Sequence, residues 1–280
     1  MNTTTASKAS SITIPDFNLI KQRQQATWSS GNYANVGSRL QIVGELLAEA
    51  TDIRAGEKII DVAAGNGNAT LAAARRFAQV TSTDYVSSLL EKGAKRASAN
   101  EFDVQFKVAD AENLPFENSE FDVALSTFGV MFTPQQDKAA NELLRVIGSG
   151  GRIGLANWTP EGFLGDLFRI IGRYAPPPAG VQSPMLWGSE PRIVELFGAS
   201  ASNIQCIRRH YNFRFLSATH WIDVFRNYYG PIHKTFGSLD ASKQELLTND
   251  LTALLEKHNI GGSGSLVVPS EYLEVVITKK

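Results

Sequence analysis

KIIDVAAGNG, the stretch at residues 58–67, joins a short apolar segment to a glycine-rich loop. The short apolar run at 58–62 is typical of a buried strand. The alanine-rich residues 69–77 that follow the loop predict a helix. Glycines at 65 and 67 let the backbone approach a ligand closely, because they carry no Cβ. A strand, a glycine-rich loop and a helix in this order predict a ligand site at the carboxyl end of the strand.

Short apolar segments and helical segments alternate after this stretch. Further strands are predicted at 80–83, 104–108, 121–126 and 152–157, and helices at 86–99 and 136–147. This alternation is typical of βαβ units, whose helices cover both faces of a parallel sheet. Crossovers between parallel strands are nearly always right-handed, so the predicted fold class is α/β, with a doubly wound, Rossmann-like sheet. The run Gly148-Ser149-Gly150-Gly151 is expected to form the turn before the strand at 152–157.

The pattern changes on either side of this region. Helical periodicity over 20–50 is broken by glycines at 31 and 37, which predicts a helical segment in two parts before the sheet. After residue 157 the sequence predicts helices, an extended segment and a last strand, at 162–174, 189–197, 204–215, 219–229, 241–258 and 272–278.

We interpret residues 16–280 as a single domain, because a strand returns at the end of the chain. In this interpretation residues 58–157 form the cofactor-binding core, residues 158–264 are insertions that cover the substrate, and residues 265–280 hold the last strand. Residues 1–15 are expected to form a disordered tail.

Composition restricts the function classes. Of 280 residues, 43% are hydrophobic and 20% charged, which fits a full-sized core and excludes disorder throughout. No apolar run approaches the roughly 18 residues of a spanning helix, so an integral membrane protein is not expected. Lys and Arg number 27 against 28 Asp and Glu, a net charge of -1. Nucleic-acid binding as the main role is therefore not expected.

The cysteine and histidine content indicates a protein of a reducing compartment. Cys206 is the only cysteine, so it cannot form an internal disulfide, and no Cys/His spacing fits a zinc site. Residues 1–11 lack the apolar core of a secretory signal. We therefore expect a cytoplasmic protein without a metal, and the sequence leaves its oligomeric state open.

Four polar features follow the first four predicted strands. The first is the loop at 61–67. The second is Asp84, whose carboxylate can accept hydrogen bonds from both hydroxyls of a ribose. The third is Asp110-Ala111, where a carboxylate beside a free backbone N–H can read the edge of an adenine. The fourth, at 126–129, offers a polar group and an apolar floor to the reacting end of a ligand. Together these features predict a nucleoside site.

Two kinds of nucleoside cofactor fit such a site. Dinucleotides require a third glycine for tight packing of the helix, and Thr70 occupies that position here. A nucleoside joined to an amino acid carries no phosphate to be neutralised. The sequence therefore favours S-adenosylmethionine over NAD.

The same residues resemble the class I S-adenosylmethionine-dependent methyltransferases. Residues 59–67 are similar to the first motif of that family, and Asp84 to its ribose-binding acid. VADAENLPF at 108–116, followed by FDV at 121–123, resembles the ubiquinone/menaquinone-biosynthesis type of small-molecule methyltransferase, as do ELLRV at 142–146 and the glycine pair after it. The resemblance spans about residues 58–157. It implies a seven-stranded, mostly parallel sheet whose last strand is antiparallel and inserted at one edge, and S-adenosylmethionine as cofactor.

Two positions depart from the family pattern. Ala63 stands where the first motif has its first glycine, and Ser149 replaces the usual proline before the glycine pair. A methyl group at residue 63 crowds the place expected for the methionine carboxyl end. Alanine is the mildest replacement, so we expect cofactor binding to survive.

The expected site residues fall into two groups. The cofactor-binding group is Tyr33, Asp61, Ala63, Gly65, Asn66, Gly67, Asp84, Tyr85, Asp110, Ala111, Thr127 and Phe128. The substrate-pocket group is Trp28, Met131 and Trp158, with the helical segment 219–229 around the methyl group. Several of these residues have a structural alternative: Asp61 can bond only to loop backbone, and Trp28, Tyr33 and Trp158 can serve packing alone.

Methyl transfer is an in-line displacement at a sulfonium methyl, so the protein mainly positions the nucleophile and excludes water. A general base is needed only for a hydroxyl or a protonated amine, and the candidates are His210, His220 and His233. Aromatic residues in the carboxyl-terminal part favour an apolar or aromatic small-molecule acceptor. Two alternatives stay open at this point: an NAD-dependent oxidoreductase, and a non-enzymatic nucleoside-binding sensor, to which only Ala63 hints.

Overall fold

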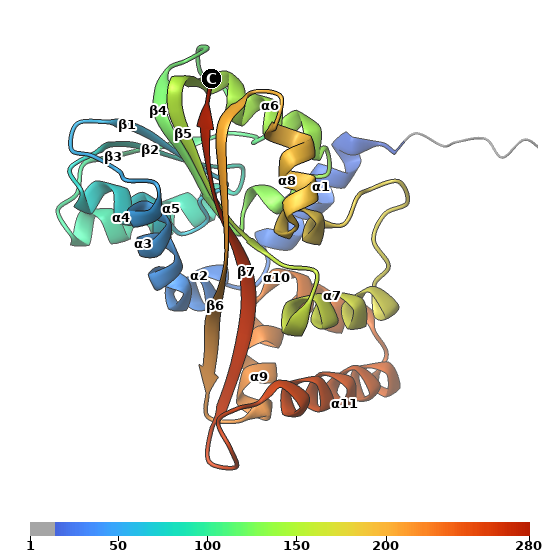
Figure 1. The fold of residues 1–280 in the computed structure, drawn as a ribbon. Helices are drawn as coiled ribbons and strands as arrows, with labels where there is room; N and C mark the ends of the chain where they lie inside the picture. Colours follow the sequence, from blue (N-terminus) through green and yellow to red (C-terminus); the bar gives the residue numbers. More distant parts are fainter. Residues whose placement is uncertain (1–14) are drawn as a thin grey trace, which may run out of the picture.

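A computed structural model describes residues 15–280, and its seven strands form one sheet (Figure 1). The strand order is β3-β2-β1-β4-β5-β7-β6. The strands are β1 (Lys58–Val62), β2 (Gln79–Asp84), β3 (Val104–Val108), β4 (Phe121–Thr127), β5 (Ile147–Trp158), β6 (Ala201–Phe215) and β7 (Leu266–Lys279). Strands β1 to β5 pair in parallel, and β7 is antiparallel to both β5 and β6. The predicted fold class, with its antiparallel last strand, is confirmed. Of the tail expected at 1–15, all but Pro15 lies outside the described residues.

Helices precede the sheet, connect its strands and pack against its last two strands, β6 and β7. In the first half of the chain they are α1 (Phe17–Trp28), α2 (Tyr33–Gly37), η1 (Ser38–Leu40), α3 (Gln41–Ala50), α4 (Asn68–Arg75), α5 (Ser87–Ala99), η2 (Val130–Phe132) and α6 (Gln136–Val146). After β5 they are α7 (Gly162–Tyr174), η3 (Pro184–Gly188), α8 (Glu190–Phe197), α9 (Ala218–Tyr228), α10 (Gly230–Ser238) and α11 (Ala241–His258). No helix within residues 15–280 is both long and apolar enough to cross a membrane.

The strand order reverses between β1 and β4. The chain runs from β1 outward to β2 and β3 and then returns to β4 on the other side of β1. Loops leaving adjacent strands in opposite directions open a crevice at the carboxyl ends of those strands. Fully buried Ile59 and Ile60 on β1 and Leu125 on β4 fix this centre of the sheet in the core. The reversal therefore sets the place of a ligand site.

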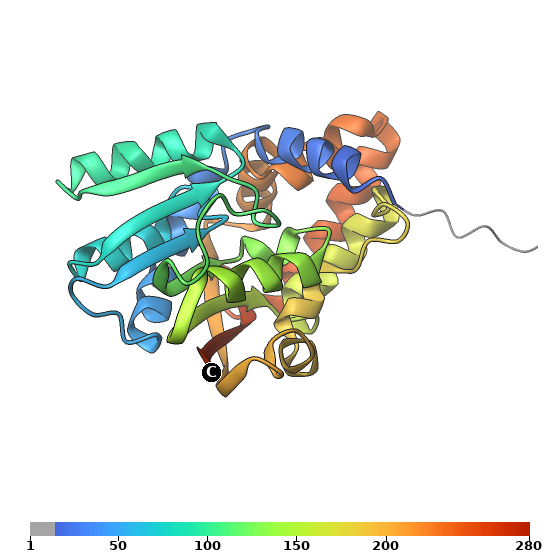
Figure 2. The same cartoon turned by 90° about the horizontal axis from the view of Figure 1, so that it is seen from above.

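Strands β6 and β7 form a long antiparallel pair that extends past the parallel strands, and α7, α9 and α11 gather around its far half (Figure 1). Seen from above, α1 lies beside α10 (Figure 2). The amino-terminal helix and the carboxyl-terminal helices thus meet on the same side of the molecule, next to the carboxyl ends of the parallel strands.

One local expectation was wrong, and one helix was not predicted. Gly148–Gly151 belongs to β5 and not to a separate turn. β5 pairs with β4 at Ile147 and again from Arg152 onward. The glycine-rich residues 148–151 between these two points therefore form a bulge at the start of β5. Helix α10, which begins at Gly230-Pro231, was not among the predicted elements. Proline is tolerated in the first turn of a helix, where its missing N–H has no partner to lose.

Candidate active site

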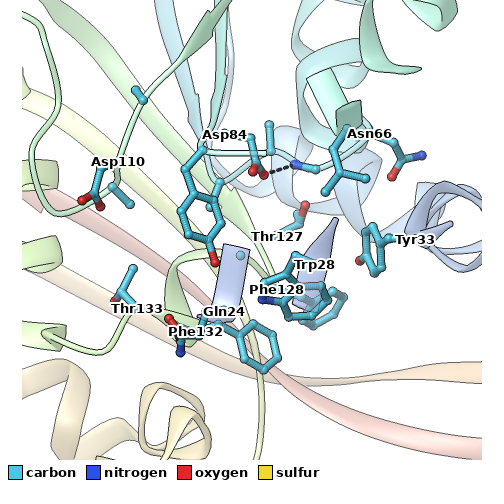
Figure 3. A pocket seen from close by; sticks show the side chains of 18 of the residues that line it. Gln24, Trp28, Tyr33, Asn66, Asp84, Asp110, Thr127, Phe128, Phe132 and Thr133 are labelled. Atoms are coloured by element: carbon cyan, nitrogen blue, oxygen red, sulfur yellow. Dashed lines mark hydrogen bonds between the residues drawn. The ribbon is translucent and has the colours of Figure 1, made fainter. Parts of the chain in front are cut away.

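A cavity of about 870 Å³, the first cavity, opens at the carboxyl ends of the parallel strands (Figure 3). Its walls come from the loop after β1, the ends of β2, β3 and β4, and the inner face of α1. Ten of the twelve expected cofactor-binding residues line it, and Asp61 and Gly67 do not; the ten are Tyr33, Ala63, Gly65, Asn66, Asp84, Tyr85, Asp110, Ala111, Thr127 and Phe128.

The glycine-rich loop presents its backbone to the first cavity. Gly65 has a φ of 57°, and a Cβ placed on it would lie 3.3 Å from the ring of Tyr33. The side-chain amide nitrogen of Asn66, which lines the cavity, is buried and has no hydrogen-bond partner within residues 15–280. Such a donor is satisfied only by a ligand or water. Gly67, with a φ of 83°, lies outside the lining and allows the turn into α4.

Ala63 adopts a backbone conformation that favours glycine. Its φ is 53°, and an L-residue in the left-handed region is destabilised by roughly 1–2 kcal/mol. The neighbouring Gly129 makes room for it, because a Cβ on Gly129 would lie 2.2 Å from the Ala63 carbonyl oxygen and 2.8 Å from the Ala63 Cβ. The departure from the family motif is therefore accommodated by a glycine on the loop after β4.

Asp84 is held at the tip of β2 by backbone amides. Gly65 N–H donates to its Oδ2 at 2.9 Å, and Val86 N–H donates to its Oδ1 at 2.8 Å. Burial raises the pKa of Asp84 to about 6, although these amides and that of Tyr85 favour the carboxylate. Each carboxylate oxygen keeps a further lone pair for a ligand hydroxyl. The side chain joins the loop after β1 to the end of β2 (Figure 3).

Asp61 is fully buried beneath the loop and does not line the first cavity. Its Oδ2 accepts hydrogen bonds from the Thr70 backbone N–H at 2.8 Å and from the Thr70 hydroxyl at 2.6 Å. Its Oδ1 has no partner within residues 15–280. Burial raises the pKa of Asp61 to about 7, against the effect of both bonds from Thr70. In this structure the carboxyl group fastens α4 to β1.

Asp110 meets a cation from the amino-terminal helix. Lys21 Nζ donates to Asp110 Oδ2 at 2.6 Å and lies 3.1 Å from the buried Glu112 Oε2. Glu112 N–H donates to Asp110 Oδ1 at 2.9 Å. Lys21, with Gln24 and Trp28, forms the α1 wall of the first cavity. A ligand amino group bound to Asp110 would therefore share that carboxylate with Lys21.

The end of β4 supplies the floor. Thr127 lines the first cavity, and Phe128 follows it with a φ of 53°. Ser126 fixes this turn, because its hydroxyl donates to the Val62 carbonyl at 2.7 Å and accepts from Val130 N–H at 3.0 Å. A strained residue held by such bonds is typical of a functional site.

A second cavity, of about 400 Å³, adjoins the first. The two share five residues, which form the wall between them: Trp28, Tyr33, Leu40, Phe128 and Phe132. The rest of the second cavity is lined by Val36, Trp158, Leu164, Leu167, Phe213, Phe225 and Tyr229. Its lining holds only aromatic and aliphatic side chains, so it suits an apolar or aromatic molecule.

Two glycines bring the distant helices of this cavity together. A Cβ on Gly230 would lie 2.2 Å from the Thr27 carbonyl oxygen, and one on Gly31 would lie 2.9 Å from that of Tyr228. Asn32 N–H also donates to the Tyr228 carbonyl at 3.1 Å. The corner between α9 and α10 therefore lies directly on the corner between α1 and α2. This contact places Tyr229 5.6 Å from Trp28, measured between ring centroids.

Other expected residues lie outside both linings. Met131 is fully buried in η2. His210 is exposed on β6, 3.9 Å from Glu271, and the Nδ1 of His220 accepts from Leu216 N–H at 3.2 Å. The Nδ1 of His233 lies 3.0 Å from the Arg226 carbonyl oxygen. The structure thus does not bring the three candidate bases to either cavity. Within residues 15–280, no three His, Cys, Asp or Glu side chains are grouped as metal ligands.

Several lining residues were not expected from the sequence. In the first cavity they include Lys21, Gln24, Phe132 and Thr133, and in the second Leu164 and Leu167. Polar residues on one face of a predicted helix are no signal of a site, because most such faces contact solvent. A weak indication of an acceptor site existed for Phe213, Phe225 and Tyr229, because they belong to an aromatic-rich part of the sequence.

Sequence comparisons relate the chain to methyltransferases. A family model described as a methyltransferase domain matches residues 59–151. An uncharacterized protein of Mycobacterium tuberculosis is 38% identical over 251 residues, covering 88% of this chain and 90% of that protein. A demethylmenaquinone methyltransferase of Clavibacter sepedonicus is 40% identical over 99 residues, covering 35% of this chain and 40% of that protein.

Solved structures show the same fold. The YcgJ protein of Bacillus subtilis aligns with a TM-score of 0.59 and 19% identity, covering 84% of this chain and 97% of that one. A putative methyltransferase of Bacillus halodurans aligns with a TM-score of 0.56 and 16% identity, with the same two coverages.

Proposed function

This chain belongs to the S-adenosylmethionine-dependent methyltransferases, and we propose that it methylates a small apolar or aromatic molecule held in the second cavity. One observation carries the proposal. The second cavity shares a wall of five residues with the first, and all of its lining is aromatic or aliphatic. Two adjoining cavities of this kind suit a cofactor and an apolar acceptor that must meet at one point.

The first cavity fits the cofactor, S-adenosylmethionine. Asp84 has lone pairs left for the ribose hydroxyls, and Asp110 and the Ala111 N–H lie where an adenine edge can bind. These assignments are proposals, and they rest on the donors and acceptors that the cavity presents.

When bound, the cofactor supplies a methyl group activated by the positive charge of a sulfonium. The residues of this chain then have to orient the acceptor and keep out water, which is a competing nucleophile. The aromatic rings of Trp28, Phe128 and Phe132 at the shared wall serve both purposes in this proposal. Orientation alone can lower the barrier by roughly 7–11 kcal/mol.

The second cavity has no strong base. Its lining, within residues 15–280, includes no His, Asp, Glu, Lys or Arg. Burial raises the pKa of Tyr33 and of Tyr229 well above the usual range, so both phenols are protonated near neutral pH. The acceptor we propose is therefore one whose nucleophilic atom needs no deprotonation by a side chain of this cavity.

Turnover assays with a cavity-filling variant test the proposal. S-adenosylhomocysteine release would be measured with small aromatic acceptors for the unmodified protein, for Leu167→Trp and for Leu246→Trp. Leu167 lines the second cavity, whereas Leu246 is exposed on α11 and serves as the matched control. We expect Leu167→Trp to lose turnover but still bind S-adenosylhomocysteine. Full turnover by that variant would exclude the second cavity as the acceptor site.

A further inference from the structure

The polar groups of the second cavity share one property. They are the indole N–H groups of Trp28 and Trp158 and the hydroxyls of Tyr33 and Tyr229. Each of the four can donate a hydrogen bond. None of them bonds to another group within residues 15–280. The cavity is therefore an apolar space whose side chains offer donors and no anionic acceptor.

Tyr229 is the hydroxyl that belongs to the second cavity alone. Tyr33 also lines the first cavity and lies near Asp84, which contributes to the raised pKa of its phenol. Tyr229 lies between α9 and α10, with its ring centroid 6.3 Å from that of Tyr33 and 5.4 Å from that of Phe225. Its ring is thus fixed by aromatic neighbours while its hydroxyl has no protein partner.

A ligand that covers a donor without pairing it removes the hydrogen bond that the donor can make to water, so a ligand that accepts from the donor binds better than one that does not. A plain hydrocarbon would leave all four donors unpaired. A cationic amine would enter a space without a carboxylate. A molecule with a carbonyl, phenol or phenolate oxygen would accept a hydrogen bond and place its aromatic body against the surrounding rings.

We propose that Tyr229 determines acceptor specificity by donating a hydrogen bond to an oxygen of the acceptor, which is an oxygenated aromatic molecule. This inference rests on the proposed function, because it assumes that the acceptor occupies the second cavity. It adds the chemical class of the acceptor and the residue that selects it.

Two probes that differ by one hydroxyl test the inference. Binding of 2-naphthol and of naphthalene would be measured by calorimetry in the presence of saturating S-adenosylhomocysteine. We expect Tyr229→Phe to weaken 2-naphthol binding by about tenfold, the size of one buried hydrogen bond, and to change naphthalene binding less than twofold. Tyr228→Phe is the matched control, because Tyr228 is the adjacent tyrosine on α9 and does not line the cavity.

The outcomes separate this inference from the proposed function. Unchanged 2-naphthol binding by Tyr229→Phe, or an equal loss for both probes, would overturn the role of the hydroxyl. The proposed function would still stand if Leu167→Trp or Leu164→Phe abolished binding of both probes. Failure of both probes to bind the unmodified protein would overturn the inference and the proposed acceptor site together.

Discussion

Phe128 and Trp158 stack face to face, with ring centroids 3.8 Å apart and ring planes 2° from parallel. Phe128 borders both cavities, whereas Trp158 lines only the second. Tyr272 packs against both rings edge-on, at 5.7 and 6.2 Å. The stack therefore supports the wall between the two cavities from the side of the second cavity.

Replacement of Trp158 should separate acceptor binding from cofactor binding. We expect Trp158→Phe to raise the KM for the acceptor several-fold, because the smaller ring leaves part of the second cavity unfilled. Affinity for S-adenosylhomocysteine should change less than about threefold, or roughly 0.7 kcal/mol. Trp187→Phe is the control, since Trp187 is also buried but packs against Phe197 and lines neither cavity. A lower Tm for Trp158→Phe with unchanged acceptor KM would assign the ring to packing alone.

Neutralising Asp84 should weaken cofactor binding. We expect Asp84→Asn to cost about 1–3 kcal/mol of binding free energy, through the loss of charge-assisted hydrogen bonds to the ribose. Calorimetry with S-adenosylhomocysteine measures it. Asp122→Asn is the matched control, because Asp122 also accepts from a backbone amide, that of Lys58 at 2.8 Å, but does not line the first cavity. An unchanged dissociation constant for Asp84→Asn would remove Asp84 from the site.

A side chain at Gly65 should block the first cavity. Gly65→Val adds a branched group where the loop faces Tyr33, so we expect a folded variant that S-adenosylhomocysteine no longer stabilises in a thermal shift assay. The substitution also strains the backbone at φ 57°. Gly56→Val controls for strain, because Gly56 has a φ of 85° and no atom within 4 Å of its added Cβ. A normal ligand-induced shift in Gly65→Val would mean that this glycine serves only the turn.

The buried Asp61 should make the ligand-free protein less stable as the pH rises. Its pKa is raised from 3.8 to about 7, so the folded state holds a proton that the unfolded chain has lost. This contribution to stability is complete below about pH 4 and declines up to about pH 7, with a slope of at most about 1.4 kcal/mol per pH unit. Asp61→Asn keeps an oxygen for Thr70 and removes the titration.

Urea unfolding of both proteins at several pH values checks this effect. The difference in unfolding free energy, variant minus unmodified protein, should rise between about pH 4 and pH 7. Taking the difference removes the contributions that other carboxyl groups make to the pH dependence of stability. Asp166 is one of them: its pKa is lowered by Lys257, so its contribution has the opposite sign. Parallel stability curves would mean that Asp61 is ionised in the folded protein across this range.

Local sequence patterns predicted several helices and strands with the bounds that the structure shows. The strand at 104–108 and the helices at 162–174 and 241–258 have their predicted bounds. Residues such as Ile59 and Ile60 read as a buried strand because the core side of a sheet requires apolar side chains. The start of β5 was missed, because the glycine-rich residues 148–151 form a bulge between the pairs that β5 makes with β4 at Ile147 and at Arg152.

The site was predictable where it depends on the ends of the parallel strands. Asp84 and Asp110 follow strands directly, so their place was set by the alternation of strands and helices. Lys21 reaches the first cavity through its contact with Asp110, 89 residues later in the chain. Tyr229 reaches the second cavity through contacts between segments about 200 residues apart, which depend on Gly31 and Gly230. A glycine in a single sequence does not show which distant segment it approaches.

A structure of the protein with S-adenosylhomocysteine bound tests the central claim most directly. The account predicts that the ribose hydroxyls lie within hydrogen-bond distance of Asp84 and that the sulfur faces the second cavity through the wall containing Tyr33 and Phe128. A complex in which the sulfur points away from that wall, or in which the ligand lies outside the first cavity, would contradict the account.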